Sequence, residues 1–203
     1  MWNSAFNHDI SNWDVSNVTN MELMFESASS FNQDIGNWDV SNVSNMFRMF
    51  YNAGTFNHDI SNWDVSNVTN MELMFAGTYS FNNPIGNWNI GNVTNIEGMF
   101  SYSGFNQDIS DLDISNISSM SNLFRDSQFN QPIGNWDVSN VTNMNYMFHG
   151  SPFNQDISDW NVSGVTTMQH MFEESDFNQD ISDWEFGTVD MLNIFNNSAL
   201  STV

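Results

Sequence analysis

The sequence lacks cysteine and lysine, and Arg48 and Arg125 are its only Lys or Arg residues. Without cysteine the chain forms no disulfide and no thiol-based metal site. The formal net charge is −22 over 203 residues, whereas binding to phosphate requires clustered Lys and Arg. We therefore do not expect nucleic acids or anionic membranes as partners, while cationic partners and divalent ions remain compatible with the charge.

Long apolar runs are also missing. No segment has the length of a transmembrane helix or the pattern of a signal peptide, so direct membrane insertion is not expected. The chain is then either not exported or a fragment of a longer protein. Such acidity often accompanies disorder, but aromatic residues make up 15% of the chain and recur at a fixed period, which favours a packed core.

One phrase fills the chain eight times. Residues 6–25 recur without change at 56–75. A fixed period in the twenties is typical of a solenoid, in which each coil buries its apolar side only against its neighbours. We therefore treat residues 1–203 as a single array of eight repeats of 24 or 25 residues, which begin at Phe6, Phe31, Phe56, Phe81, Phe105, Phe129, Phe153 and Phe177.

In register, the repeat is FNQDIxNWDVSNVTNMxxMF followed by four or five small polar residues. Its apolar columns predict an inward-facing core of stacked Phe, Ile, Trp, Val and Met. The segment Trp13-Asp14-Val15 alternates apolar and polar residues, which predicts a short strand. Ile10, Trp13 and Val15 also have the L-x-x-L-x-L spacing of the strand of a leucine-rich repeat.

The next part of the repeat changes period. Val18, Met21, Met24 and Phe25 lie on one face of a helical turn, and Thr19-x-x-Glu22 has the spacing of a capping box. We therefore predict an α/β repeat solenoid, a leucine-rich-repeat-like coil stack. Its parallel β-sheet on one face would be formed by segments such as 13–15, 38–40 and 63–65, with short helices or turns on the other.

The repeat resembles the bacterial surface protein repeat of about 26 residues, found in the BspA-like leucine-rich-repeat surface proteins. Phe31–Ile35, Trp38–Val40 and Met49–Phe50 carry the match, which extends over essentially the whole chain. The resemblance implies an extracellular or cell-surface location and a role in adhesion. The partner would be a protein or glycan on another cell surface. It implies no catalytic residues.

Two polar columns are candidate binding sites. The first faces outward from the expected strand and would form an acidic concave face that either recognises a ligand, holds divalent cations weakly, or is simply solvated. Its members are Asp14, Asp39, Asp64, Asn89, Asp113, Asp137, Asn161 and Glu185. The second either accepts hydrogen bonds from local backbone N–H groups or is a weak site for divalent cations such as Ca²⁺, and no other cofactor is expected. Its members are Asp9, Asp34, Asp59, Asp108, Asp156 and Asp180.

Enzymatic activity is not expected. The chain has no nucleophile elbow, zinc-binding helix motif or phosphate loop. A catalytic site requires one unusual environment, whereas the carboxylates of this chain lie in near-copies of one environment. The four histidines occur in unrelated or widely separated coils, so we expect neither a metal site nor catalysis from them.

Two functions remain. One is a surface binding or adhesion module, and the alternative is a structural array or stalk that self-associates end to end. A variable patch on the concave face would favour binding, and uniform faces would favour the structural role. The concave columns are rather uniform, so the structural role stays open. Met1–Ala5 resembles the tail of a preceding coil, and no polar capping unit is recognisable at either end. We therefore expect the terminal coils to expose apolar residues, among them Phe6 and Phe195.

Overall fold

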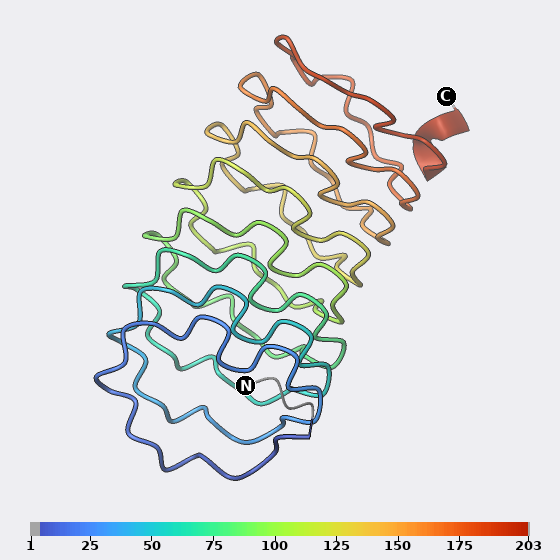
Figure 1. Cartoon of the computed structure of the whole chain (residues 1–203). Coiled ribbons are helices and arrows are strands. Elements are labelled where there is room, and N and C mark those ends of the chain that lie inside the picture. Colours follow the sequence, from blue (N-terminus) through green and yellow to red (C-terminus); the bar gives the residue numbers. More distant parts are fainter. Residues whose placement is uncertain (1–4, 203) are drawn as a thin grey trace.

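The computed structural model describes residues 5–202. Figure 1 shows this part of the chain as a stack of coils, with the first coils at one end and the last at the other. Long-range hydrogen bonds between coils join residues 21 to 28 positions apart, as between Asn32 and Asn7 or Trp38 and Ile10. The expected coil tail at Met1–Ser4 lies outside the described residues.

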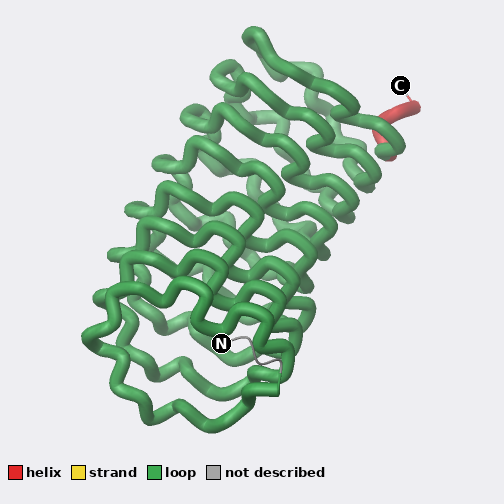
Figure 2. The backbone as a smooth tube through the Cα atoms, viewed as in Figure 1, coloured by secondary structure: helices red, strands yellow, loops and turns green. Residues whose placement is uncertain are grey.

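Regular secondary structure is almost absent from residues 5–202, as the loop colouring of Figure 2 shows. The helix there is η1 (Ala199–Thr202), a single 3₁₀ turn, and no extended strand forms. Single-residue parallel bridges instead link successive coils. They join Asn20 to Asn45, Asn45 to Asn70, Asn70 to Asn95, Ser119 to Asn143, Asn143 to Thr167, and Thr167 to Asp190.

The strands predicted at 13–15, 38–40 and 63–65 are wrong. The parallel bridges lie at Asn20 and its equivalents, several residues further along each repeat. Between the predicted strand segments, side chains link the coils: the Trp38 indole donates to the Ile10 carbonyl and the Asn42 amide to the Ser16 carbonyl. Because these side chains satisfy backbone carbonyls, the segment needs no strand ladder.

The predicted short helix is also wrong. The N–H of Met24 donates to the Met21 carbonyl and that of Ala28 to the Phe25 carbonyl, so the segment is a chain of tight turns. Residues equivalent to Leu23 and Ser27 have a positive φ in every coil, which an α-helix does not tolerate. Turns and helices both place residues three apart on one side, and this shared spacing explains the error.

A row of backbone hydrogen bonds runs along this segment in one direction. The N–H groups of Met21, Leu23 and Phe25 donate to the carbonyls of Asn45, Phe47 and Met49 in the next coil, at 2.8 to 3.0 Å. Later coils repeat the pattern. In this segment every coil therefore presents donors toward the C-terminal end of the stack, whereas the N–H groups of Ser44 and its equivalents donate toward the N-terminal end, as from Ser44 to Thr19.

The predicted apolar columns form the core. Apart from the first and last members of the columns and a few partly exposed residues, the Phe, Ile, Val and Met side chains are buried. Two Phe columns stack on one another: Phe25 lies 4.0 Å from Phe31, and Phe50 lies 4.2 Å from Phe56, between ring centroids. These offset contacts add to the burial of apolar area, so each coil is held by its neighbours.

The ends of the stack are less covered, as expected. Trp13 is 47% exposed, whereas Trp63 in the middle is 4% exposed. Phe6 and Phe195 are partly buried. At the C-terminal end a mostly apolar hollow of about 610 Å³ opens between Trp184, Phe186 and Met191. The terminal coils therefore expose apolar side chains whose equivalents in the inner coils are buried.

Candidate ligand-binding groove

The first acidic column points into solvent, as predicted, but its carboxylates are already engaged. Oδ1 of Asp14 accepts hydrogen bonds from the Ser16 hydroxyl at 2.6 Å and from the Ser16 N–H at 3.1 Å. These two bonds, the hydroxyl first, lower the pKa of Asp14. The side-chain hydroxyl and backbone N–H two residues on also lower the pKa of Asp39, Asp64, Asp113 and Asp137.

Repulsion along this column is present but weaker than the hydrogen bonds. The charges of Asp14 and Asp64 raise the pKa of Asp39, yet the hydrogen bonds from Ser41 leave it below its ordinary value. Asn89 and Asn161 accept from Gly91 and Ser163 in the same manner. The column therefore has one repeated local turn rather than a distinct binding geometry.

The second acidic column behaves in the same way. Each Asp accepts the N–H two residues on, from Ser11 to Asp9 at 2.9 Å and from Gly36 to Asp34 at 3.0 Å. The backbone bond is the main reason that the pKa is lowered at Asp9, Asp59, Asp108, Asp156 and Asp180. Within residues 5–202 no three His, Asp or Glu side chains are grouped so as to hold a metal ion.

Sequence variation is concentrated elsewhere, on the segment of tight turns. We call the side chains equivalent to Glu22, Leu23, Glu26 and Ser27 the variable face. At the position of Glu26, for example, the coils carry Glu26, Tyr51, Ala76, Ser101, Arg125, His149, Glu173 and Asn196. Since the buried columns are nearly constant, this face is where one coil differs from the next.

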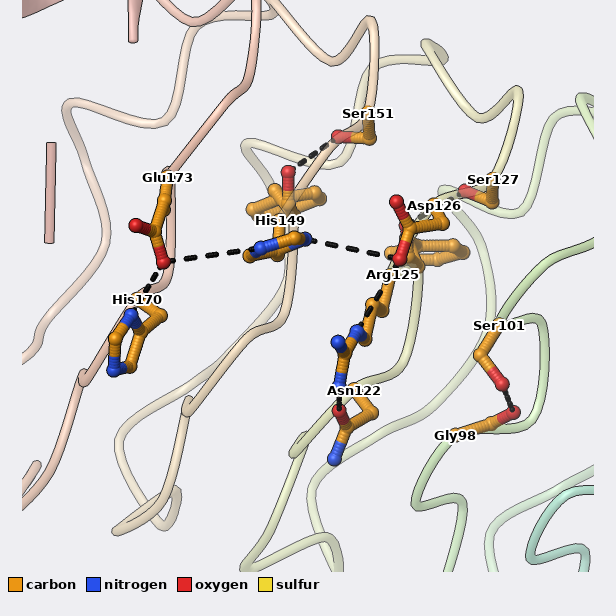
Figure 3. A network of polar contacts seen from close by, with 12 residues as sticks. Gly98, Ser101, Asn122, Arg125, Asp126, Ser127, His149, Ser151, His170 and Glu173 are labelled. Atoms are coloured by element: carbon orange, nitrogen blue, oxygen red, sulfur yellow. Dashed lines mark hydrogen bonds and ion pairs between the residues drawn. The ribbon is translucent and has the colours of Figure 1, made fainter. Parts of the chain in front are cut away.

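A groove of about 290 Å³ lies on the variable face over the second to fifth coils. Its floor is formed by Ala76, Gly77, Gly98 and Ser101, all buried, at positions where neighbouring coils carry larger side chains. Figure 3 shows Asn122 and Arg125 standing beside Gly98 and Ser101. Loss of side-chain volume in two adjacent coils therefore creates the groove.

Tyrosines form part of the rim. Tyr51, Tyr79 and Tyr102 line the groove, and Tyr79 is 71% exposed. A Cβ added at Gly54 would lie 3.4 Å from the Tyr79 ring, and one added at Gly104 would lie 2.1 Å from the Tyr79 carbonyl oxygen. The loop that carries this exposed ring is therefore enclosed between two coils, each of which has glycine at the point of contact.

Two carboxylates line the groove, and each is positioned by the following coil. The Asn95 amide donates to Oε2 of Glu72 at 2.9 Å, and the Ser119 hydroxyl donates to Oε1 of Glu97. The second oxygen of each glutamate has no hydrogen-bond partner within residues 5–202. Both are therefore oriented acceptors at the groove.

The two arginines of the chain lie beside this groove. The Arg48 guanidinium sits 4.0 Å from the centroid of the Tyr51 ring and forms an ion pair with Glu26 at 3.1 Å. Arg125 lines the groove and pairs with the adjacent Asp126 at 3.3 Å. Both cations are thus balanced by a carboxylate and held against an aromatic ring.

A second polar cluster extends along the variable face, beyond Arg125 (Figure 3). The His149 ring lies between two carboxylates, 3.7 Å from Asp126 and 3.8 Å from Glu173, and the His170 ring also contacts Glu173. A hydrogen bond from the Asn196 amide is the main cause of the lowered pKa of Glu173. The cluster joins polar side chains of four successive coils, from Asp126 to Asn196.

Neither feature was predicted from the sequence. The histidines were expected in unrelated or widely separated coils, whereas His149 and His170 occupy adjacent coils and share Glu173. Binding residues were expected in the uniform acidic columns, whereas the groove forms where the repeat departs from its consensus. An alignment of the positions equivalent to Glu26 and Ser27 could have indicated the groove. Ala76 and Gly77 are small, and the residue equivalent to Ala76 in the next coil is the small Ser101.

Coils that touch only their neighbours, with a constant core and one variable face, define a repeat protein built as a stack of turns. The chain belongs to the family described as Mycoplasma protein of unknown function, DUF285, whose model matches residues 1–75 and 101–202. The unmatched residues 76–100 supply Ala76, Gly77, Tyr79, Glu97 and Gly98 of the groove. No curated protein and no solved structure matches the chain.

Within residues 5–202 the longest helix is η1, and none is long and apolar enough to cross a membrane.

Proposed function

We propose that this chain is a non-catalytic binding or adhesion module of the BspA-like, leucine-rich-repeat-like kind, carried at a cell surface. The single observation that carries the proposal is the groove between Tyr79, Tyr102 and Arg125, which is a distinct environment on an otherwise repetitive molecule. Its partner is a protein or glycan on another cell surface. The DUF285 match supports a repeat family and is compatible with this role.

The geometry of the groove favours binding over catalysis. Ligand sites are concave and have a few convergent polar groups with aromatic walls, and the groove has both. Its glutamates are each held by an amide or a hydroxyl. No nucleophile paired with a base lies among its lining residues, so the arrangement supports recognition of an intact partner.

The acidic columns have a different role in this proposal. Their carboxylates accept hydrogen bonds within their own turns and remain exposed. They keep the repetitive surface negatively charged, which discourages lateral aggregation. A partner that contacts Asp14, Asp39 and the other members of the acidic concave face would then gain electrostatic attraction there but little selectivity.

The proposal is tested by adhesion of beads that carry the chain. Beads coated with wild-type protein are expected to be retained on at least one type of cell surface, and the double variant Tyr79→Ala/Tyr102→Ala is expected to lose that retention. The matched control is Asp64→Asn/Asp137→Asn, which changes two exposed residues of the acidic column. Loss of retention in the control but not in the groove variant would assign binding to the acidic face and contradict the proposed site.

The alternative is a structural array that associates end to end. It is favoured by the exposed apolar ends of the stack, where Trp13 is 47% and Met191 40% exposed. Beads that are retained on no cell surface, together with concentration-dependent assembly of the free protein, would support the array and not the adhesion module.

A further inference from the structure

We propose that the groove binds a ring of a neutral carbohydrate, stacked on Tyr79 and hydrogen-bonded by Glu72, Glu97 and Arg125. This inference rests on the proposed function, because it names the ligand class of the same site. The groove volume of about 290 Å³ is near the lower end of ligand pockets, at roughly 300 Å³. It suits one ring of a longer glycan whose neighbouring units extend into solvent.

Exposed aromatic rings supply the first requirement. A pyranose ring has faces of C–H groups and an edge of hydroxyl groups, so it packs against an aromatic face while its edge stays polar. Tyr79 and Tyr102 are 71% and 45% exposed at the groove. Contiguous exposed apolar surface with a polar rim marks binding sites, and the Tyr79 loop packs closely against Gly54 and Gly104 in the absence of a ligand. Such preorganisation reduces the entropy lost on binding.

Hydrogen-bonding groups of both kinds supply the second requirement. Glu72 and Glu97 line the groove, and each has one oxygen that accepts no hydrogen bond from residues 5–202 and is available as an acceptor. On the other wall Arg125 provides guanidinium N–H donors, of which Nε contacts Asp126 and Nη1 contacts Asn122. Neighbouring hydroxyl groups of a sugar both donate and accept, so one ring satisfies both walls.

The charges of the lining argue against ionic ligands. An anion would lie against Glu72 and Glu97, in a chain of net charge −22. A cation would lie against Arg125, and one face of the Tyr51 ring is already occupied by Arg48 at 4.0 Å. Since Arg125 is itself balanced by Asp126 at 3.3 Å, a neutral ligand with many hydroxyl groups matches the groove best.

The test is affinity electrophoresis of the full chain in native gels. Separate gels contain a neutral polysaccharide (dextran, mannan, galactan or starch), an acidic one (heparin or hyaluronate), or polylysine. We expect at least one neutral polysaccharide to retard the protein. Tyr79→Ala is expected to weaken this retardation at least about tenfold, because the stacking surface is lost. Tyr79→Phe keeps the ring and is expected to stay within about threefold of wild type.

Two further variants separate the site from the rest of the face. Glu97→Gln keeps the shape but turns an acceptor oxygen into a donor, and is expected to weaken retardation. Leu192→Ala removes an exposed apolar side chain of the variable face that does not line the groove, and is expected to leave retardation unchanged. Urea unfolding midpoints of the Tyr79 variants should match wild type because this side chain is exposed, which shows that any loss of binding is local.

Two results would overturn the carbohydrate assignment. One is the absence of retardation in all neutral gels, and the other is equal retardation of Tyr79→Ala and wild type. Retardation by polylysine or heparin alone would also overturn the carbohydrate assignment: it would assign the groove to an ionic ligand if Tyr79→Ala abolishes it, and to the charged surface outside the groove if Tyr79→Ala leaves it unchanged. If bead adhesion still depends on Tyr79 and Tyr102 in those cases, the proposed function stands and only the ligand class is wrong. If adhesion is independent of both tyrosines, the function proposed for the groove fails as well.

Discussion

The indole Nε1 of Trp63 donates a hydrogen bond to the backbone carbonyl of Ile35, 28 residues earlier, at 3.1 Å. The same bond joins Trp to Ile between other pairs of coils, at 3.1 to 3.2 Å. Each of these tryptophans is at most 6% exposed. The indole therefore fills the core and also replaces part of the backbone ladder that ordinary strands would provide.

Removing this side chain should be costly in the middle of the array. We expect Trp63→Ala to lower the free energy of unfolding by about 3 to 5 kcal/mol through the cavity that it leaves. Trp63→Phe should cost less, since it loses the hydrogen bond but keeps most of the packing. Urea unfolding followed by fluorescence measures both. Trp13→Ala is the control, because Trp13 is 47% exposed, and a cost equal to that of Trp63→Ala would contradict the role of burial.

Leu112 interrupts the Trp column, so the contribution of the indole can also be tested by inserting a tryptophan there. The Ile85 carbonyl lacks the indole donor that its equivalents have, and a small apolar cavity of about 20 Å³ lies among Leu112, Trp88 and Trp136. We expect Leu112→Trp to restore the ladder and raise stability by about 1 kcal/mol. The urea midpoint checks this. A lower midpoint would mean that the coils around Leu112 have adjusted to the smaller side chain.

The core columns could be predicted from the sequence because burial depends on which residues are apolar and repeated, as for Phe31, Ile35 and Val40. The backbone between them could not. A strand at 13–15 and a helix after Val18 fit the spacing of the apolar residues, but so does a chain of tight turns. The positive φ at Leu23 and Ser27 decides in favour of the tight turns. Leu and Ser rarely adopt a positive φ, so the residue types do not predict it.

The groove illustrates the same limit. Consensus positions such as Asp14 were predicted as binding residues because they recur in successive coils. Their recurrence reflects a local structural role, which at Asp14 is to accept a hydrogen bond from Ser16. Ala76 and Gly77 are unremarkable as single residues. They form a groove only because Tyr51 lies on one side and Arg125 on the other, which requires the coils to be in register.

Left-handed backbone at non-glycine residues provides a stability test. Glu174 is exposed and has φ +58°, whereas the equivalent residues Gly77 and Gly150 have φ +72° and +63°. Glu174→Gly should stabilise the protein by about 1 kcal/mol, because glycine adopts this conformation without strain. Glu185→Gly, at an exposed position without positive φ, should destabilise it instead. Thermal unfolding of both variants is the measurement, and a loss of stability in both would contradict the argument.

The turn carboxylates should respond to acid and to loss of one hydroxyl. The pKa of Asp64 is lowered, chiefly by the Ser66 hydroxyl and then by the Ser66 N–H. A lowered folded-state pKa means that the stabilisation is present above the ordinary Asp value of 3.8 and is lost as the pH falls through the folded pKa. Ser66→Ala should raise the Asp64 pKa toward 3.8, as measured by carboxyl NMR titration. Ser61→Ala, which removes the hydroxyl near Asp59, should leave Asp64 unchanged.

The open C-terminal coil gives the last prediction. Phe186 and Met191 are 42% and 40% exposed and line the apolar hollow, while Trp13 is uncovered at the other end of the stack. Backbone N–H groups of the tight-turn segment donate toward the C-terminal end, as Phe172 does to Ile194, so a second copy placed head to tail would continue this row. We expect the mass measured by light scattering to rise with protein concentration.

Added salt should promote this association, because copies with a net charge of −22 repel one another less when screened. The variant Phe186→Asp/Met191→Asp should remain monomeric. Leu192→Asp is the matched control, since Leu192 is 55% exposed but does not line the hollow, and it should associate as the wild type does. A wild-type mass that stays monomeric at every concentration and salt level would remove the support for an end-to-end array. Adhesion through the groove would then be the one role that the observations favour.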